Sequence, residues 1–78
     1  METPVTVVGW ENLITDKGNS GTRLFVTREL HSEDCAGVET LRYYINPEYC
    51  KYVPVIGDLL VIVEGRYPGS VERVIKVG

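Results

Sequence analysis

Apolar and polar residues alternate along most of this chain, and turn-forming residues interrupt the alternation several times. A period of two is typical of β-strands that bury one face. Gly9, inside the first apolar segment, predicts a bulge or sharp bend. The continuous apolar run 59–63 indicates a strand that is buried on both faces or central in a curved sheet. The pattern predicts five strands: residues 3–14, 22–30, 38–45, 58–66 and 71–77.

On the second and third predicted strands, one face carries the apolar residues and is expected to face the core. Leu24 and Val26 mark this face on the second strand, and Leu41 and Tyr43 mark it on the third. The opposite face is unusual for an acidic chain, because it combines arginines with aromatic rings. Its residues are Arg23, Phe25, Arg42 and Tyr44.

The connections between the segments limit the number of possible folds. In "NPEYCKY", Asn46 suits a helix N-cap and Pro47 suits the first helical position, so a single helical turn is expected between strands 3 and 4. In "YPGS", Pro68 and Gly69 predict a type II turn. A small sheet must close or pair to hide its edges. We therefore predict an all-β fold, a five-stranded oligonucleotide-binding (OB-like) barrel, with a five-stranded SH3-like barrel as the alternative.

Composition agrees with one small β-domain over residues 1–78. The chain has five tyrosines and eight glycines, a mix that favours strands and turns. Its net charge of −3 argues against broad attraction to polyanions but leaves room for a local basic surface. No apolar run of about 20 residues and no signal-like start is present, so we expect a cytoplasmic protein without membrane association.

Arginines and aromatic rings on one surface are typical of single-stranded nucleic-acid binding, in which cations hold phosphates and rings stack on bases. OB-like barrels place that surface on strands 2 and 3 and on two hairpin loops. The alternative is that Phe25 and Tyr44 pair across strands and cover a subunit contact. The predicted nucleic-acid-binding residues are Arg23, Phe25, Arg42, Tyr44, Lys17, Arg66 and Tyr67.

Catalytic and metal chemistry is weakly represented. His31, Cys35 and Cys50 could ligate zinc with Glu33 or Asp34, but their spacing is not a zinc signature. The cysteines are expected to be free thiols. The chain has one histidine and no nucleotide-binding or paired-carboxylate motif. We expect no metal, no cofactor and no enzymatic activity.

The remaining large side chains are assigned to the barrel itself. Trp10 is interpreted as a barrel anchor rather than an exposed stacking residue, and Cys50 as a small core residue. Tyr49 and Tyr52 are expected to cover the open end of the barrel. On the fifth strand, a single face is expected to carry Val71, Arg73, Ile75 and Val77.

A Lys-Gly hairpin, "TDKGNSGTRLFVTREL", leads to the aromatic strand "LRYYIN", then to "YVPVIGDLLVIVEGRYPGS" and the closing strand "VERVIKVG". This layout resembles the small single-stranded DNA-binding proteins of filamentous phages and bacterial mobile elements. The resemblance implies an OB-like barrel, a homodimer and cooperative coating of single-stranded DNA. It implies binding roles for Arg23, Phe25, Arg42, Tyr44, Arg66 and Tyr67.

The acidic balance departs from that family, because Glu29, Glu39 and Glu64 are expected to border the binding face. The leading hypothesis is a non-catalytic single-stranded DNA-binding accessory protein. The alternative is a protein-interaction module, or a subunit of a larger assembly, with no nucleic-acid role.

Overall fold

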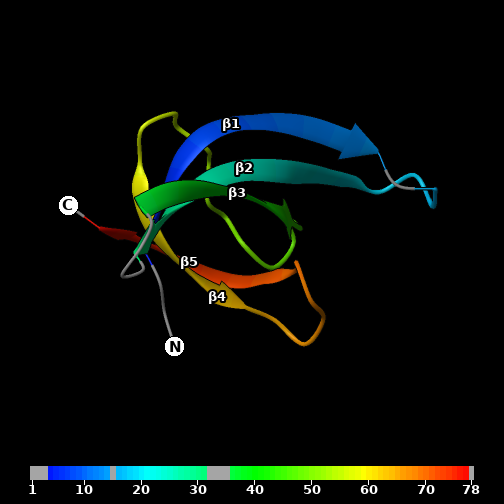
Figure 1. Ribbon diagram of the computed structural model, residues 1–78. Helices are drawn as coiled ribbons and strands as arrows, with labels where there is room; N and C mark the ends of the chain where they lie inside the picture. Colours follow the sequence, from blue (N-terminus) through cyan, green and yellow to red (C-terminus); the bar gives the residue numbers. More distant parts are fainter. Residues whose placement is uncertain (1–3, 15, 32–35, 78) are drawn as a thin grey trace.

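A computed structural model describes residues 4–14, 16–31 and 36–77, and it is built from one antiparallel sheet. The order of strands across the sheet is β3-β2-β1-β4-β5 (Figure 1). The predicted all-β class is therefore confirmed, and the described residues contain no helix. The strands are β1 Pro4–Ile14, β2 Ser20–His31, β3 Ala36–Ile45, β4 Leu59–Glu64 and β5 Val71–Val77.

The core lies on the concave side of the curved sheet and follows the alternation of the strands (Figure 1). β4 is central, between β1 and β5, and its burial alternates: Leu60 and Ile62 are buried, whereas Leu59 is exposed. The alternative of burial on both faces is therefore wrong for this run. The core consists of Val5, Val7, Leu24, Val26, Ile45, Cys50, Leu60, Ile62 and Val71.

Two bulges change which residues face the core. The predicted irregularity at Gly9 is confirmed, because the β1–β2 register shifts between Val7 and Gly9. One extra residue reverses the alternation beyond it, so Trp10 lies opposite Leu24, on the core side of the sheet. Trp10 nevertheless remains 45% exposed, which does not suit an anchor.

The second bulge lies between β4 and β5 and was not predicted. The register shifts between Val63 and Glu64, whose partners are Arg73 and Val71. The expectation that Val71, Arg73, Ile75 and Val77 share one face is therefore wrong. Val71 is buried, but beyond the extra residue it is Val74 that packs against the core, and Ile75 and Val77 turn outward.

The two edge strands approach each other at one point. Ser70, at the start of β5, forms a parallel bridge with Tyr44 of β3, whose N–H donates to the carbonyl of Gly69 at 2.8 Å. Gly69 has φ +80°, and the Ser70 N–H donates to the Tyr67 carbonyl at 3.1 Å. Both values suit the predicted type II turn. Apart from this bridge, no hydrogen bonding between the described residues of β3 and β5 closes the sheet.

The connection from β3 to β4 begins with a hydrogen-bonded turn at the position of the predicted helical turn. The N–H groups of Tyr49 and Cys50 both donate to the Asn46 carbonyl, at 3.0 and 2.9 Å. The Asn46 Oδ1 accepts from the Glu48 N–H at 2.9 Å, the bond expected of a capping residue. Tyr49 is 77% exposed, so its predicted role in covering the barrel end is wrong.

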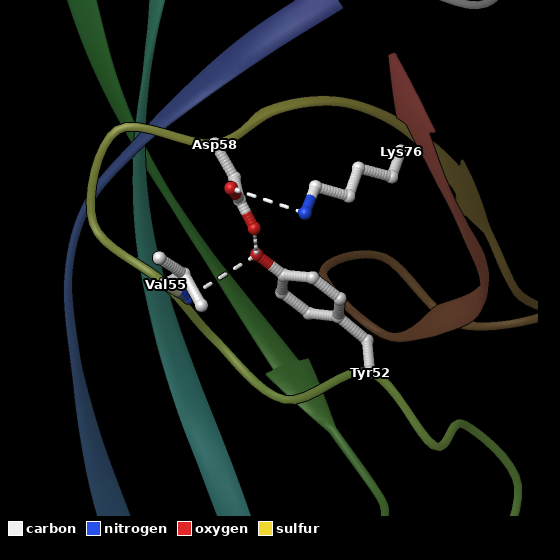
Figure 2. Close-up of polar contacts among 4 residues, drawn as sticks. All are labelled: Tyr52, Val55, Asp58 and Lys76. Atoms are coloured by element: carbon white, nitrogen blue, oxygen red, sulfur yellow. Dashed lines mark hydrogen bonds and ion pairs between the residues drawn. The ribbon is translucent and has the colours of Figure 1, made fainter. Parts of the chain in front are cut away.

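Tyr52 and Asp58 fasten the rest of this connection (Figure 2). The Tyr52 hydroxyl donates to Asp58 Oδ2 at 2.7 Å and accepts from the Val55 N–H at 3.3 Å. Lys76 Nζ of β5 lies 3.7 Å from the other carboxylate oxygen. The Asp58 carbonyl accepts from the Val7 N–H of β1 at 2.9 Å, so the connection is tied to strands on both sides.

Candidate nucleic-acid interface

The register of β2 and β3 brings the four outward residues of the two strands into one block. Arg23 lies directly opposite Tyr44, and Phe25 lies directly opposite Arg42. Leu24, between the two rows, is fully buried and marks the core side, so the block lies on the outer face. Each row therefore places one guanidinium beside one aromatic ring, within the range of cross-strand contact.

Glycines beneath the two rings set how they lie. A Cβ added at Gly21 would overlap the far end of the Tyr44 ring, so this ring lies directly across the Gly21 backbone. A Cβ added at Gly9 would meet Phe25 Cδ2 at 3.8 Å, an ordinary contact. The Tyr44 ring thus depends on a residue without a side chain at position 21. The second strand was predicted to begin at residue 22, so the sequence did not reveal this role of Gly21.

A pocket of about 360 Å³ adjoins the block. Its walls include Arg23, Arg42 and Tyr44 from the strands. The opposite wall is the turn at Pro68 and Gly69, which the bond from the Tyr44 N–H to the Gly69 carbonyl holds against β3. Phe25 is not among the lining residues. The pocket therefore combines two cations and two tyrosines, Tyr43 and Tyr44, with a backbone turn, which suits a flat anionic ligand.

The acidic neighbour of the block is Glu11, which sequence reasoning missed. Its Oε1 lies 2.8 Å from Arg23 Nη1, and both side chains are more than 40% exposed. An exposed pair of this kind contributes only about 0–1 kcal/mol, so it leaves Arg23 available to a ligand. The signal that could have found it is the hairpin register, which pairs Glu11 with Arg23. Among residues 4–14, 16–31 and 36–77, no acidic side chain forms an ion pair with Arg42.

The three glutamates expected to border the face differ in where they lie. Glu39 forms an ion pair with Arg28 on the core-facing row of β2 and β3. Glu64, at the end of β4, is close enough to Tyr43 to raise the pKa of that phenol, after the larger effect of burial. Glu29 lies opposite Val38, toward the other end of the strand pair. The charge expectation is therefore wrong for Glu39, because the register places it on the core-facing row. Glu64 stays close to the site, since its charge acts on Tyr43, which lines the pocket.

The remaining predicted binding residues lie on two loops. Arg66 and Tyr67 are exposed in the β4–β5 connection, directly before the turn that walls the pocket. Lys17 is exposed in the β1–β2 turn, at the tip of the long hairpin, which lies apart from the β4–β5 connection in Figure 1. The fold thus gathers Arg23, Arg42 and Tyr44 around one pocket, with Phe25, Arg66 and Tyr67 next to it and Lys17 apart.

Metal binding and membrane crossing by a helix find no support among the described residues. The described residues contain no group of three His, Cys, Asp or Glu side chains that could hold a metal ion. Of the zinc ligands considered, Cys50 is buried in the core as a free thiol, as expected. Cys35, Glu33 and Asp34 lie outside the described residues. The part of the chain that the structure describes has no helix with the length and apolarity that crossing a membrane would need.

No family model, curated protein or solved structure matches this chain.

Proposed function

We propose that this protein binds single-stranded DNA without catalysis, through the outer face of β2 and β3. The observation that carries the proposal is the register of Arg23 with Tyr44 and of Phe25 with Arg42. It places two guanidinium groups and two rings in one solvent-facing block beside a pocket. Single-stranded nucleic acid is held by this combination, with bases on the rings and phosphates on the cations.

An OB-like barrel is the architecture we propose for this function. In support, β1 pairs with both β2 and β4, and the parallel bridge of Tyr44 with Ser70 brings β3 to the start of β5. Such barrels bind oligonucleotides on strands 2 and 3 and on the loops that join strands 1 to 2 and 4 to 5. Lys17 lies on the first of these loops, and Arg66 and Tyr67 lie on the second.

Binding would be largely independent of sequence, because stacking and phosphate contacts read no base edge. Each phosphate contact adds about −0.7 to the slope of the logarithm of affinity against the logarithm of salt concentration. Contacts from Arg23, Arg42 and Arg66 would together give a slope of about −2. The net charge of −3 lowers the long-range attraction but not these local contacts.

The test is the fluorescence anisotropy of labelled oligo-dT at low and moderate salt. The wild-type protein should bind, and affinity should fall as salt rises. Tyr44→Ala should weaken binding about 5- to 150-fold, the equivalent of about 1–3 kcal/mol of lost stacking. Tyr49→Ala is the matched control, because this exposed tyrosine is not among the residues that line the pocket beside Tyr44, so its loss should leave binding there unchanged. Folded protein with no anisotropy change at low salt would falsify the proposal.

A second candidate function, self-association, rests on the outer face of β4 and β5. Cross-strand pairs there are apolar: Leu59 lies opposite Val77, and Val61 lies opposite Ile75. Leu59, Ile75 and Val77 are 42%, 38% and 39% exposed. An apolar sheet face of this kind fits a second copy of the chain, as in a homodimer. Sedimentation across a range of concentrations tests it, and a monomer at the highest concentration used for DNA binding would exclude it.

A further inference from the structure

The pocket beside Tyr44 is the first of three that adjoin one another around the β1–β2 arm, the part of this hairpin beyond Trp10 and Leu24. A second pocket, of about 540 Å³, shares Leu13 with it. A third, of about 400 Å³, shares Asn12, Thr22 and Pro47 with the second. The three pockets therefore follow one another from Tyr44 to Trp10, and they are called the groove below.

Two features of the chain open this path. β3 ends at Ile45, opposite Thr22, whereas β2 begins at Ser20, so the edge of β2 is uncovered by β3 where the groove crosses it. The bulge after Val7 then turns Trp10 to the core side of the arm, where it lies beside the 50–54 segment. The groove thus passes from the outer face of the sheet to its inner side.

The far end of the groove has the same chemistry as its start. Trp10 is 45% exposed, and indole offers the largest stacking surface of any side chain. Tyr52 lies in the same wall, where its bond to Asp58 holds the hydroxyl. Lys51 is exposed beside them and supplies a cation. Of the described residues that line the three pockets, none is acidic.

We propose that a single strand bound at Tyr44 continues along this groove, past Leu13 and Pro47, to stack one base on Trp10 with a neighbouring phosphate at Lys51. This inference rests on the proposed DNA-binding function and extends its site. It replaces the interpretation of Trp10 as a barrel anchor. The occupant is a continuation of the same strand because the groove is continuous with the β2–β3 interface and carries only positive charge among its described lining residues.

Oligonucleotide length separates the two ends of the groove. Trp10 is the one tryptophan of the chain, so its emission reports the far end, while anisotropy of a labelled oligonucleotide reports binding anywhere. The probe is oligo-dT from about 2 to about 16 nucleotides, which spans the site sizes of about 4–16 nucleotides known for such barrels. Short oligonucleotides should raise anisotropy without quenching Trp10, and quenching should begin only at a greater length.

Variants sharpen the result. Trp10→Ala should weaken binding of long oligonucleotides about 5- to 150-fold and leave that of short ones unchanged. Trp10→Phe, which keeps a ring, should recover part of the loss.

Lys51→Gln changes an exposed residue, so it tests the groove even where Trp10→Ala fails to fold. It should reduce the salt slope for long oligonucleotides by about 0.7. Arg73→Gln, which removes an exposed charge that lines none of the three pockets, is the control.

Each outcome decides. The groove is overturned, and DNA binding is left intact, if oligonucleotides of every length bind without changing Trp10 emission. In that case Trp10→Ala and Lys51→Gln would also bind like the wild type. Quenching by the shortest oligonucleotides, unaffected by Tyr44→Ala, also overturns it, because Trp10 would then be a separate site. Absence of any anisotropy change at low salt refutes the proposed function itself.

Discussion

The outer faces of β2–β3 and β4–β5 belong to one sheet but differ in chemistry. On β2–β3, cross-strand pairs join an arginine to an aromatic ring: Arg23 to Tyr44, and Phe25 to Arg42. On β4–β5, the cross-strand pairs Val61 with Ile75 and Leu59 with Val77 are aliphatic. Both faces are turned away from the same core, so burial in the core does not explain the difference in their residues. The difference indicates that the first face suits a polar, anionic ligand and the second a protein surface.

The largest expected effect comes from Gly21→Val. The new side chain would occupy the position of the Tyr44 ring and drive it from its place beside the pocket. Oligo-dT affinity should therefore fall as far as in Tyr44→Ala, by about 5- to 150-fold. Unfolding in urea should show a loss of about 1–3 kcal/mol from overpacking.

The control for Gly21→Val is Gly37→Val in β3, where an added Cβ would meet nothing within 4 Å. It should leave oligo-dT affinity unchanged. If Gly21→Val bound like the wild type, the Tyr44 ring would not be part of the interface.

Tyr52→Phe tests whether the two faces depend on the connection between them. Loss of the hydrogen bond to Asp58 should lower stability by about 1.5–3 kcal/mol in urea unfolding, while self-association and the affinity for oligonucleotides too short to reach Tyr52 stay unchanged. Changes in binding or self-association of the same size would show that the faces are coupled through this connection.

The same variant should change the pH dependence of stability. Burial, followed by the bond to Asp58, raises the pKa of Tyr52 above the usual value of 10.0. The unfolded chain therefore loses this proton first as the pH rises, and the stabilisation present below pH 10 is lost through the folded-state pKa. In Tyr52→Phe the fall in stability above pH 10 should be shallower, with the part due to Tyr43, whose pKa is also raised, remaining.

Ile75→Asp tests the apolar face alone. A carboxylate in the middle of this face should raise the dissociation constant for self-association by at least about 10-fold, because a buried unpaired charge is costly. Oligo-dT affinity per chain should not change. Ile75→Val, which keeps the surface apolar, should associate like the wild type. A fall in DNA affinity in Ile75→Asp would mean that one ligand uses both faces.

Two exposed arginines, one on each outer face, allow the two faces to be compared by the same substitution. Arg42 lies on the β2–β3 face and Arg73 on the β4–β5 face, opposite Val63. Each Arg→Gln change lowers the net charge equally. Arg42→Gln should reduce the salt slope of oligo-dT binding by about 0.7, and Arg73→Gln should leave it unchanged. Equal effects would show that only net charge matters and that the block has no special role.

The smallest effect is expected from Glu11→Gln, which removes the ion-pair partner of Arg23. Stability should change by less than about 1 kcal/mol, since the pair is exposed. Oligo-dT affinity should rise modestly, by about 2-fold, a gain of about 0.4 kcal/mol. Glu72→Gln removes the same charge from exposed β5 and should raise affinity less. A smaller gain for Glu11→Gln than for Glu72→Gln would argue that Arg23 does not contact the ligand.

Local chemistry explains what could be predicted. The strands were placed to within a few residues at their ends, because a period-two pattern and turn residues act over short distances. The Gly9 bulge and the turn at Pro68 and Gly69 were predicted for the same reason. The OB-like closure of the sheet and the binding role of the β2–β3 residues stay predictions. The register of β2 with β3 now states which of these residues lie opposite one another.

Long-range pairing explains what could not be predicted. The β5 bulge, which turns Ile75 outward, depends on how β4 aligns with β5. The pairing of Glu11 with Arg23 and the place of the Tyr44 ring over Gly21 depend on residues at least twelve positions apart. A pattern within one segment does not contain this information.

By itself, the sequence determined five strands, the inward and outward residues of β2 and β3, and the main turns, because these follow from alternation and backbone preferences. Only the tertiary structure decided which outward residues meet, that Glu11 rather than Glu39 borders the arginines, and that Trp10 lines a pocket with Lys51 and Tyr52. The physical reason is that strand register and bulges are set by packing between distant segments, and one inserted residue moves every later side chain to the other face.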